Sequence, residues 1–445
     1  MAHPTTARAQ WESTGSGISA SQRTIFNISA VDENVLWAIT LKLTSGIAYE
    51  FCRSTNGGTD WTAGLLPDTI GSYYPLYIQA LNDQTAWVVM VRLPLQDRVR
   101  LFKTDNGGTD WYERTGDFNV PDAGFAALHF FNSDEGIAFG SPGTGDASVD
   151  SLRIYRTVDG GDDWTRIPVS ALPPPLAGEG VWVYGANSYE AKGDTLWFVT
   201  RASRVFRSTD RGATWEAFDV GISGNANSPG LSSVAFQNHM QGIATSYSPS
   251  QAATTADGGE TWTPIAIPST PLAADIEYIP GTVATYIVHQ DWFDGSFTTN
   301  KFLRTRNGGD TWDTLTFSPA IKVVKFLSAS IGFGGSKIIL PDSGGVYKWT
   351  GDIAASVHDV VQSDPALELF PNPALGQVTV RLPEHTPLPA VLTLELFNGL
   401  GQAVKRVPLR SRLTDIQLDD LSSGPYFYQL QDGEQVLRAG ILMKE

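Results

Sequence analysis

The sequence predicts an all-β protein, a seven-bladed β-propeller followed by an immunoglobulin-like β-sandwich. Three observations support this prediction. An eight-residue motif recurs six times at intervals of roughly 50 residues, four strand-like segments fill each interval, and the composition changes after Trp349. The 445 residues include 44 glycines and 13 tryptophans, and only 18% are charged, which is typical of short strands joined by tight turns.

The motif has the residue types of a reinforced β-hairpin. It reads Ser/Thr-x-Asp/Asn-x-Gly-x-x-Trp and occupies residues 54–61, 104–111, 157–164, 208–215, 255–262 and 305–312. We expect the Asp or Asn to bind backbone N–H groups of the turn, the Gly to supply a positive φ, and the Trp to be buried as the next strand begins. The structural residues predicted in this way are Asn56, Gly58, Trp61, Asn106, Gly108, Trp111, Asp159, Gly161, Trp164, Asp210, Gly212, Trp215, Asp257, Gly259, Trp262, Asn307, Gly309 and Trp312.

Each motif follows three shorter strand-like segments, such as 25–28, 35–40 and 48–52 in the first unit. Four antiparallel strands at this period describe a propeller blade. A seventh unit has segments 321–326, 331–333 and 345–349 but no motif. We expect the isolated segment 10–14 to supply its outer strand and close the ring, because closure removes the free edges of an open array. Six or eight blades are the alternatives.

The motif resembles the Asp-box, or bacterial neuraminidase repeat, of sialidases, sortilin-type receptors, some xyloglucanases and the photosystem II assembly-factor family. The resemblance covers residues 10–351, with Asn in place of Asp at Asn56, Asn106 and Asn307. It implies that the motif is structural and that ligands bind at the loops on the opposite face. Those loops include 68–75, 116–124, 140–151, 168–182, 221–230 and 289–300 and supply the candidate ligand residues Tyr73, Tyr74, Trp182, Asp291 and Trp292.

Residues 367–445 form a second domain after a polar linker, 352–366. Strand-like segments at 378–382, 392–397, 403–407, 414–418, 426–430 and 439–443 predict the sandwich. Three ordered motifs, at 369–376, 396–401 and 421–426, resemble the type A C-terminal sorting domain of the type IX secretion system, with Asn398 where the family commonly has Asp. The residues that carry this resemblance are Pro371, Asn372, Pro373, Gly376, Gly401, Gly424 and Tyr426.

The second resemblance implies export through the periplasm to the outer-membrane surface, or release from the cell. The expected partners are the type IX translocon and its attachment machinery, with a cut in the linker. A generic adhesion or carbohydrate module is the alternative. Residues 1–9 either are the remnant of a signal peptide or form a disordered N-terminus. No apolar run reaches the length of a transmembrane helix.

The net charge and the positions of the cysteine and histidine residues argue against several functions. A formal net charge of −16 disfavours nucleic-acid partners. The only cysteine, Cys52, lies in an apolar run and is predicted to be buried. Six scattered histidines suggest no metal site, although aspartate-rich loops leave Ca²⁺ open. No arginine triad of a sialidase is apparent, so we assign no catalytic, cofactor-binding or metal-binding residue.

These observations favour a binding or scaffold propeller without chemistry of its own, which holds an unknown protein or glycan on its loop face. A propeller-type glycoside hydrolase, sialidase-like or glucanase-like, is one alternative, because the loops carry carboxylates, among them Asp117, Asp122, Glu179 and Asp294. A structural subunit of a surface assembly is the other.

Overall fold

The computed structural model divides into two compact units, residues 1–354 and 355–445, and each is treated by itself. The structure describes residues 11–14, 18, 23–42, 49–67, 73–92, 99–115, 124–141, 152–176, 179–181, 188–222, 230–246, 251–268, 274–290, 300–317, 321–336, 345–354, 368–382, 392–398, 402–432 and 435–445. Within these residues nearly all regular structure is β-strand; the only helix is the short 3-10 turn η2 (Val169–Ala171). None of the described helices is long and apolar enough to cross a membrane.

In its described residues the first unit contains seven four-stranded antiparallel sheets. The first three sheets are β2 (Arg23–Ala30), β3 (Leu36–Lys42), β4 (Glu50–Ser54) and β5 (Thr62–Leu65); β6 (Tyr73–Ala80), β7 (Ala86–Arg92), β8 (Val99–Thr104) and β9 (Tyr112–Glu113); and β10 (Gly124–Phe130), β11 (Gly136–Ser141), β12 (Arg153–Thr157) and β13 (Thr165–Arg166). In each of them neighbouring strands are consecutive in the chain, as hairpin connections require.

The next three sheets repeat this order. They are β14 (Tyr189–Lys192), β15 (Thr195–Val199), β16 (Arg204–Ser208) and β17 (Glu216–Asp219); β18 (Leu231–Phe236), β19 (Gly242–Ser246), β20 (Ala252–Thr255) and β21 (Thr263–Ile265); and β22 (Ala274–Tyr278), β23 (Tyr286–Gln290), β24 (Asn300–Thr305) and β25 (Asp313–Phe317). The seventh sheet joins the two ends of the unit: β26 (Ile321–Phe326), β27 (Gly332–Ser336), β28 (Val346–Trp349) and β1 (Trp11–Ser13).

The pairing of β1 with β28 confirms the predicted closing strand. The two strands are antiparallel, and Trp11 lies opposite Trp349. The Trp11 side chain is 3% exposed and meets the rings of Trp349 and Phe326 edge-on, at centroid distances of 5.1 and 5.9 Å. Burial of this ring gives the closing strand an apolar anchor as well as its backbone hydrogen bonds.

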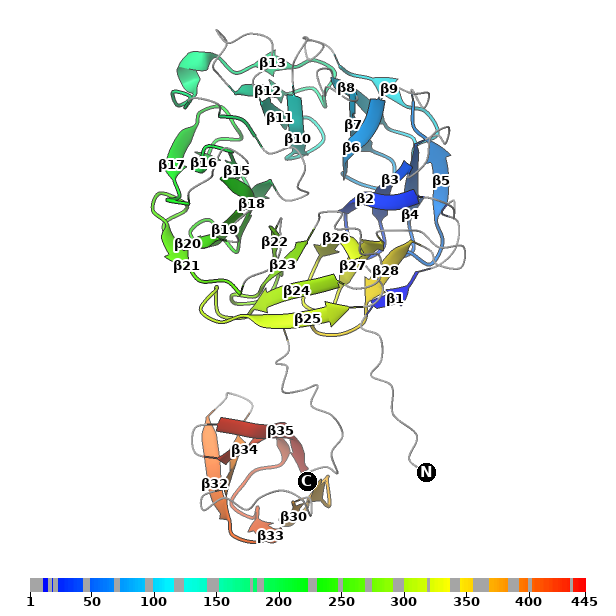
Figure 1. Ribbon diagram of the computed structural model, residues 1–445. Coiled ribbons are helices and arrows are strands. Elements are labelled where there is room, and N and C mark those ends of the chain that lie inside the picture. Colours follow the sequence, from blue (N-terminus) through cyan, green and yellow to red (C-terminus); the bar gives the residue numbers. More distant parts are fainter. Residues whose placement is uncertain are drawn as a thin grey trace. The chain divides into compact units, whose positions relative to one another are not determined.

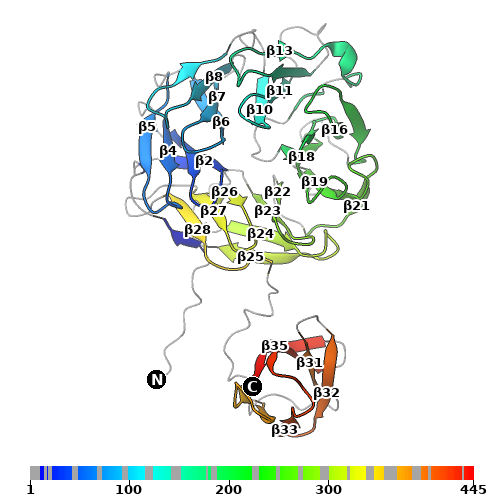
Figure 2. The same ribbon diagram turned by 180° about the vertical axis from the view of Figure 1, so that it is seen from behind.

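The seven sheets stand side by side around a common centre, with β2, β6, β10, β18, β22 and β26 nearest to it (Figures 1 and 2). A hydrogen bond links each sheet to the next around the ring. These bonds are Ile78 N–H to Asn27 Oδ1 (3.2 Å), Phe130 N–H to Gln79 Oε1 (2.8 Å), Tyr189 O–H to Leu128 O (3.1 Å), His239 Nε2 with Lys192 O (3.0 Å), Ile276 N–H to Ser233 Oγ (3.0 Å), Phe326 N–H to Glu277 Oε1 (3.0 Å) and Thr24 O–H to Ser336 O (3.1 Å).

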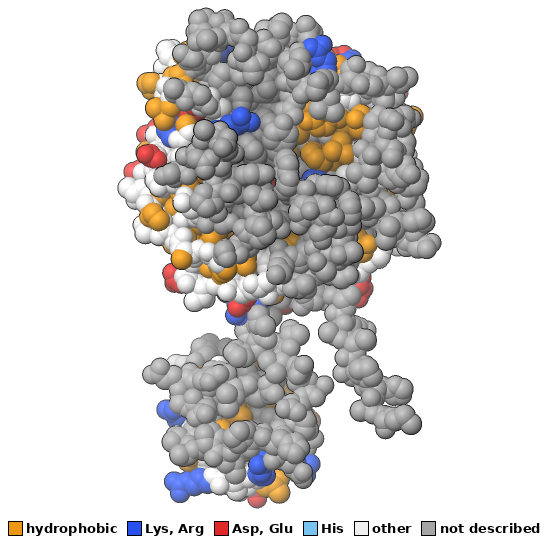
Figure 3. Space-filling view, viewed as in Figure 1, with side chains coloured by type: hydrophobic (Ala, Val, Ile, Leu, Met, Phe, Trp, Pro, Cys, Tyr) orange, Lys and Arg blue, Asp and Glu red, His pale blue; other side chains and the backbone are white. Residues whose placement is uncertain are grey.

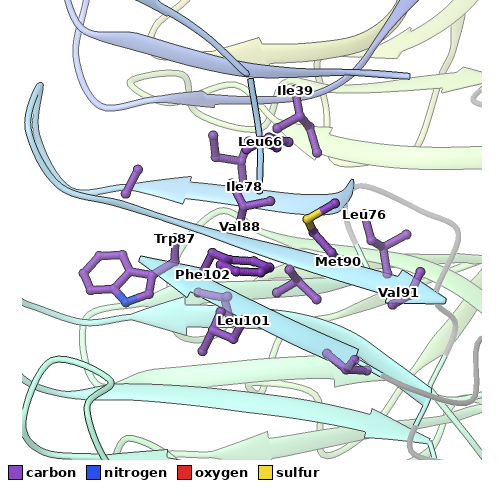
Figure 4. Close-up of a cluster of buried hydrophobic side chains, with 14 of the residues drawn as sticks. Ile39, Leu66, Leu76, Ile78, Trp87, Val88, Met90, Val91, Leu101 and Phe102 are labelled. Atoms are coloured by element: carbon purple, nitrogen blue, oxygen red, sulfur yellow. The ribbon is translucent and has the colours of Figure 1, made fainter. Parts of the chain in front are cut away.

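The core lies between adjacent sheets. Figure 4 shows one such layer, in which Trp87, Val88 and Phe102 lie among aliphatic side chains of the first and second sheets. Each fully buried large apolar side chain contributes about 1.5–3 kcal/mol. Cys52 is fully buried, as predicted, and burial raises the pKa of its thiol, so the sulfur is an apolar filler and not a nucleophile.

The recurring motif forms the hairpin before the fourth strand of the first six sheets. In each copy the Ser or Thr hydroxyl accepts the N–H of the glycine at the fifth position of the motif, at 2.7–3.0 Å. The Asp or Asn Oδ1 accepts the N–H four residues further on at 2.9–3.0 Å. This fifth-position glycine has a φ of +81° to +104°, a region that favours glycine. Side chains therefore satisfy the turn's donors, and the turn fixes the start of the outer strand.

The second unit consists of two sheets that share one core. The three-stranded sheet contains β29 (Glu368–Phe370), β30 (Gln377–Arg381) and β33 (Leu413–Gln417); the four-stranded sheet has the order β32 (Ala403–Leu409), β31 (Leu392–Phe397), β34 (Gly424–Asp432) and β35 (Gln435–Lys444). Val378 and Ile416 from the first sheet pack with Leu394, Leu430 and Leu442 from the second. Alternation of apolar and polar residues along the strands places these side chains on the inner faces.

Candidate functional site

The loops predicted to bind ligands lie mostly outside the described residues. This applies to Trp182, Asp291 and Trp292 and to the loop acids Asp117, Asp122 and Asp294. The two tyrosines of the set begin strand β6. Tyr74 is 8% exposed and belongs to the apolar core, whereas Tyr73 is half-buried, with the Arg100 guanidinium carbon 5.6 Å from its ring centre.

Glu179 is the loop carboxylate of this set that the structure describes, and its carboxylate is bonded to other residues of the protein. It is 4% exposed and forms an ion pair with the guanidinium of Arg204. The Thr200 hydroxyl (2.9 Å) and the Leu176 N–H (3.0 Å) also donate to its carboxylate. Because its acceptors are satisfied by the protein, Glu179 holds the segment before β14 against β16 and is not available to a ligand.

A cavity of about 280 Å³ lies among the innermost strands near the centre of the ring, and we call it the axial cavity. Strands β2, β6, β10, β14, β22 and β26 each contribute to its lining. Its polar side chains are Asn27, Ser29, Tyr77, Gln79, His129, Tyr189, Glu190, Glu277 and Lys325. On the face seen in Figure 3, in contrast, the charged side chains that are described lie scattered over the ring.

One position of the innermost strand supplies much of this polar lining. The penultimate residue of five strands lines the axial cavity with a polar side chain: Ser29 in β2, Gln79 in β6, His129 in β10, Glu277 in β22 and Lys325 in β26. These residues lie two or fewer residues from the hairpin turn on the Asp-box side of each sheet. The cavity is therefore built from the repeat itself, with a different polar residue at the same position in five of the seven sheets.

Gln79 and Glu277 each accept a hydrogen bond from the last residue of the next inner strand, Gln79 through an amide and Glu277 through a carboxyl group. The Gln79 amide accepts the N–H of Phe130, the last residue of β10, at 2.8 Å and donates to its carbonyl at 3.3 Å. Glu277 Oε1 accepts the N–H of Phe326, the last residue of β26, at 3.0 Å. An ionised carboxylate has no proton to donate, so Glu277 Oε2 cannot complete the pair as the amide does.

The charge on Glu277 is buried and only partly compensated. Its side chain is 4% exposed, and Lys325 Nζ lies 3.3 Å from Oε1, with 43% of the Lys325 side chain exposed. Oε2 is buried and has no hydrogen-bond partner among the described residues. Burial raises the pKa of Glu277, although the Lys325 ammonium and the Phe326 N–H lower it. Attraction to Glu277, opposed by burial, raises the pKa of Lys325, so this side chain stays charged.

A pair of tyrosines and a histidine form the opposite part of the lining. The Tyr77 and Tyr189 hydroxyls are 2.5 Å apart, and Tyr189 O–H donates to Leu128 O at 3.1 Å. Burial raises the pKa of both hydroxyls, so neither ionises near neutrality. The His129 ring meets Tyr189 edge-on at 5.8 Å, and burial lowers the pKa of His129 to about 4. His129 is therefore neutral at physiological pH.

The cavity lining brings together acidic side chains from two sheets of the first unit. In the part of the chain that the structure describes, no group of three His, Cys, Asp or Glu side chains could hold a metal ion. Two carboxylates, Glu190 and Glu277, line the same cavity. The Glu190 carboxylate lies 3.3 Å from Lys192 Nζ, whose residue is not part of the lining.

Sequence reasoning did not identify this cavity. The segment 321–326 was predicted as a strand with the bounds that the structure gives it, whereas 274–278 was not among the strand-like segments named from the sequence. The available signal was a charged residue at the penultimate position of both otherwise mostly apolar segments, Glu277 and Lys325. Alternation predicts that such residues face out of the core, but only the closed ring makes their side of the strands the inside of a cavity.

The sorting-signal residues that are described surround the last strand of the second unit. Asn372 Oδ1 accepts the N–H of Met443 at 2.8 Å, and Pro371 and Pro373 flank it. The Gly376 carbonyl accepts the Leu418 N–H at 2.7 Å. Tyr426 is buried and donates its hydroxyl to Ser422 O at 2.9 Å, and Gly424 has a φ of +144°. Gly401 lies outside the described residues.

Two families match parts of the sequence. Residues 368–444 match the secretion system C-terminal sorting domain, and residues 75–230 match the photosynthesis system II assembly factor YCF48. No curated protein matches the sequence significantly. The sorting-domain match supports secretion and an interaction with the type IX secretion machinery.

Solved structures resemble the fold at low sequence identity. YCF48 bound to D1 peptide is 17% identical with a TM-score of 0.51, over 79% of this chain and 100% of that one. An ancestral GH74 enzyme is 13% identical with a TM-score of 0.51, over 98% of this chain and 64% of that one. The RRP9 WD40 repeats are 8% identical with a TM-score of 0.50, over 77% of this chain and 99% of that one. These likenesses show an all-β propeller fold.

Proposed function

We propose that this chain, which combines a β-propeller of the bacterial neuraminidase repeat type with a C-terminal sorting domain of the type IX secretion system, is a secreted or surface-displayed binding protein without chemistry of its own. In this proposal the seven four-stranded sheets are seven blades within residues 10–351, and the two sheets of residues 367–445 form an immunoglobulin-like sandwich. Residues 352–366 are the linker between them.

The match of residues 368–444 to the sorting domain is the observation that carries the proposed route. The chain would cross the inner membrane, reach the type IX translocon in the periplasm and pass to the outer-membrane surface. Cleavage in the linker would leave the propeller as the functional part. Asn372 and Ala374 form hydrogen bonds with Met443 in the last strand, which supports a compact domain that a translocon can recognise.

The propeller supports binding more than catalysis. The buried carboxylate Glu179 and the tyrosine pair of the axial cavity are engaged in bonds within the protein. A solved structure with a similar fold is YCF48 bound to D1 peptide, which supports a protein ligand as a partner class beside a glycan. The candidate contacts are the loop residues Tyr73, Trp182, Asp291 and Trp292, with the axial cavity as a second site.

Deletion of residues 367–445 tests the route. We expect the truncated chain to accumulate in the periplasm of a type IX-competent host, while the full chain appears at the surface or in the medium. The test is fractionation with detection of the propeller. Fusion of residues 352–445 to a periplasmic reporter is the matched gain-of-function arm and should export it. Surface delivery of the truncated chain would refute the proposal.

A glycoside hydrolase is the second candidate, because Glu190 and Glu277 line one cavity and the pKa of Glu277 is raised, as a general acid requires. Against it, Oε1 of Glu277 is already bonded to the Phe326 N–H and paired with Lys325. Turnover assays on labelled glucans and sialosides decide between the two. Hydrolysis that is lost in both E190Q and E277Q would establish the enzyme and overturn the binding-only proposal.

A further inference from the structure

Glu277, a residue of the axial-cavity lining, carries a carboxylate oxygen to which no described residue donates a hydrogen bond. Glu277 Oε2 is buried and unpartnered among the described residues, and Glu277 lines the cavity. We propose that the axial cavity binds a small organic cation, an ammonium or guanidinium compound, with the Glu277 carboxylate as its counter-ion. This deepens the proposed binding function and rests on it.

The first argument is the hydrogen-bond inventory. An ionised carboxylate accepts only, and a buried acceptor without a donor is costly. At the equivalent position Gln79 satisfies both of its polar atoms against Phe130. Glu277 satisfies Oε1 in the same way against Phe326 and keeps Oε2 free. The carboxylate of Glu277 therefore lacks the donor contact that the Gln79 amide makes, and one of its acceptor oxygens has no partner among the described residues.

The second argument is the charge of the lining. Its acidic side chains are Glu190 and Glu277, and its lysine is Lys325. His129 is neutral, and Lys192, which pairs with Glu190, is outside the lining. Each of the two carboxylates therefore has one ammonium 3.3 Å away, and the preference for a cationic ligand rests on the unpartnered Oε2 of Glu277. A charged donor also gives Oε2 the stronger, charge-assisted form of hydrogen bond.

The third argument is size. A cavity of about 280 Å³ is at the lower end of the range for ligand sites, so it suits a compact molecule and not an oligosaccharide. The Tyr77 and Tyr189 rings, with centroids 6.1 Å apart, give the cavity an aromatic wall for the aliphatic part of such a ligand. A four-carbon alkylammonium is a suitable probe.

The variant E277Q isolates the charge. Gln79 shows that a glutamine at this position forms both inter-sheet bonds, so we expect E277Q to fold and to retain the contact with Phe326. The variant K325Q has the opposite effect, because it removes the ammonium that competes for the same carboxylate. E33Q, an exposed carboxylate in the turn after β2, is the matched control for the general acidity of the surface.

The experiment is calorimetric titration of the purified full chain with butylammonium chloride, 1-butanol and sodium butyrate at constant ionic strength. We expect butylammonium alone to bind, with an affinity about tenfold or more lower in E277Q. K325Q should bind it several-fold more tightly, and E33Q should match the original chain. Thermal unfolding monitored by tryptophan fluorescence checks that each variant is folded.

Three results would overturn the inference: no binding of butylammonium, equal binding of 1-butanol or butyrate, or an affinity that E277Q leaves unchanged. If E277Q does not fold, the gain in K325Q still decides, since a mere structural ion pair predicts no gain. Export of the chain depends on residues 367–445 and not on this cavity. If the chain is exported normally but its cavity binds no ammonium compound, the proposed cation site is wrong. The proposed export route is not affected by that result.

Discussion

At the scale of single residues, Gly212 of the fourth Asp box combines two constraints, a positive φ and a close neighbour. Gly212 has a φ of +81°, and a Cβ added there would lie 2.1 Å from Ile137 Cδ1. Gly221 has a φ of +71° with no heavy atom within 4 Å of such a Cβ. The two positions therefore separate backbone strain from overpacking.

We predict that G221A lowers the free energy of unfolding by about 1–2 kcal/mol, the cost of a left-handed backbone for alanine. G212A should add about 1–3 kcal/mol for the collision with Ile137. Urea unfolding followed by tryptophan fluorescence measures both, because all 13 tryptophans precede residue 355 and report on the first unit. Equal losses in the two variants would contradict the packing argument.

Asp257 gives the Asp box a dependence on pH. Burial raises the pKa of Asp257, but hydrogen bonds from the Thr261 hydroxyl and N–H and from the Thr255 hydroxyl outweigh it and lower the pKa to about 2, from an ordinary value of 3.8. A carboxyl with a lowered folded pKa stabilises the fold above its unfolded pKa, and this stabilisation is lost as the pH falls through the folded pKa.

We predict that D257N folds normally, because Asn fills this position in three other boxes, at Asn56, Asn106 and Asn307. The stability advantage of the original chain over D257N should be present at neutral pH and disappear between about pH 4 and pH 2. Unfolding midpoints across this range test it, with D105N, an exposed carboxylate, as the control. An advantage that persists unchanged at pH 2 would rule out the carboxylate as its source.

At the scale of elements, the closing strand β1 ties residues from the start of the unit to its last sheet. We predict that W11A lowers the free energy of unfolding by about 3–5 kcal/mol, since Trp11 is 3% exposed and packs on Trp349 and Phe326. Removal of residues 1–14 should destabilise the unit at least as much, because it also exposes the edge of β28. Removal of residues 1–10 leaves β1 intact and should have little effect. Denaturant unfolding measures all three.

The elements show how far sequence reasoning reaches in this fold. Strands β26 and β31 were predicted with the bounds that the structure gives them, because their apolar runs end at turn residues. The box hairpins were predictable because their residues act locally, within eight positions. The axial cavity was not predictable, because Tyr77, Glu190 and Glu277 meet only when the ring closes. Local patterns therefore define the sheets, and long-range closure defines the site.

At the scale of the whole molecule, the two units have separate apolar cores. One cluster of buried side chains, which includes Val378, Leu394 and Leu442, belongs entirely to residues 374–442. The other clusters lie within residues 11–353. Because hydrophobic burial is the dominant stabilising contribution, each unit has its own source of stability.

We therefore predict that residues 1–354 alone unfold at the same denaturant midpoint as the first unit of the full chain. Tryptophan fluorescence gives this comparison directly, because the C-terminal unit contains no tryptophan. W11A in the full chain is the matched positive control, since it must shift the same signal. A lower midpoint for the truncated chain would mean that the sorting domain stabilises the propeller. A chain that loses this domain after export would then be left with a weaker fold, whereas equal midpoints mean that cleavage in the linker leaves the binding unit as stable as before.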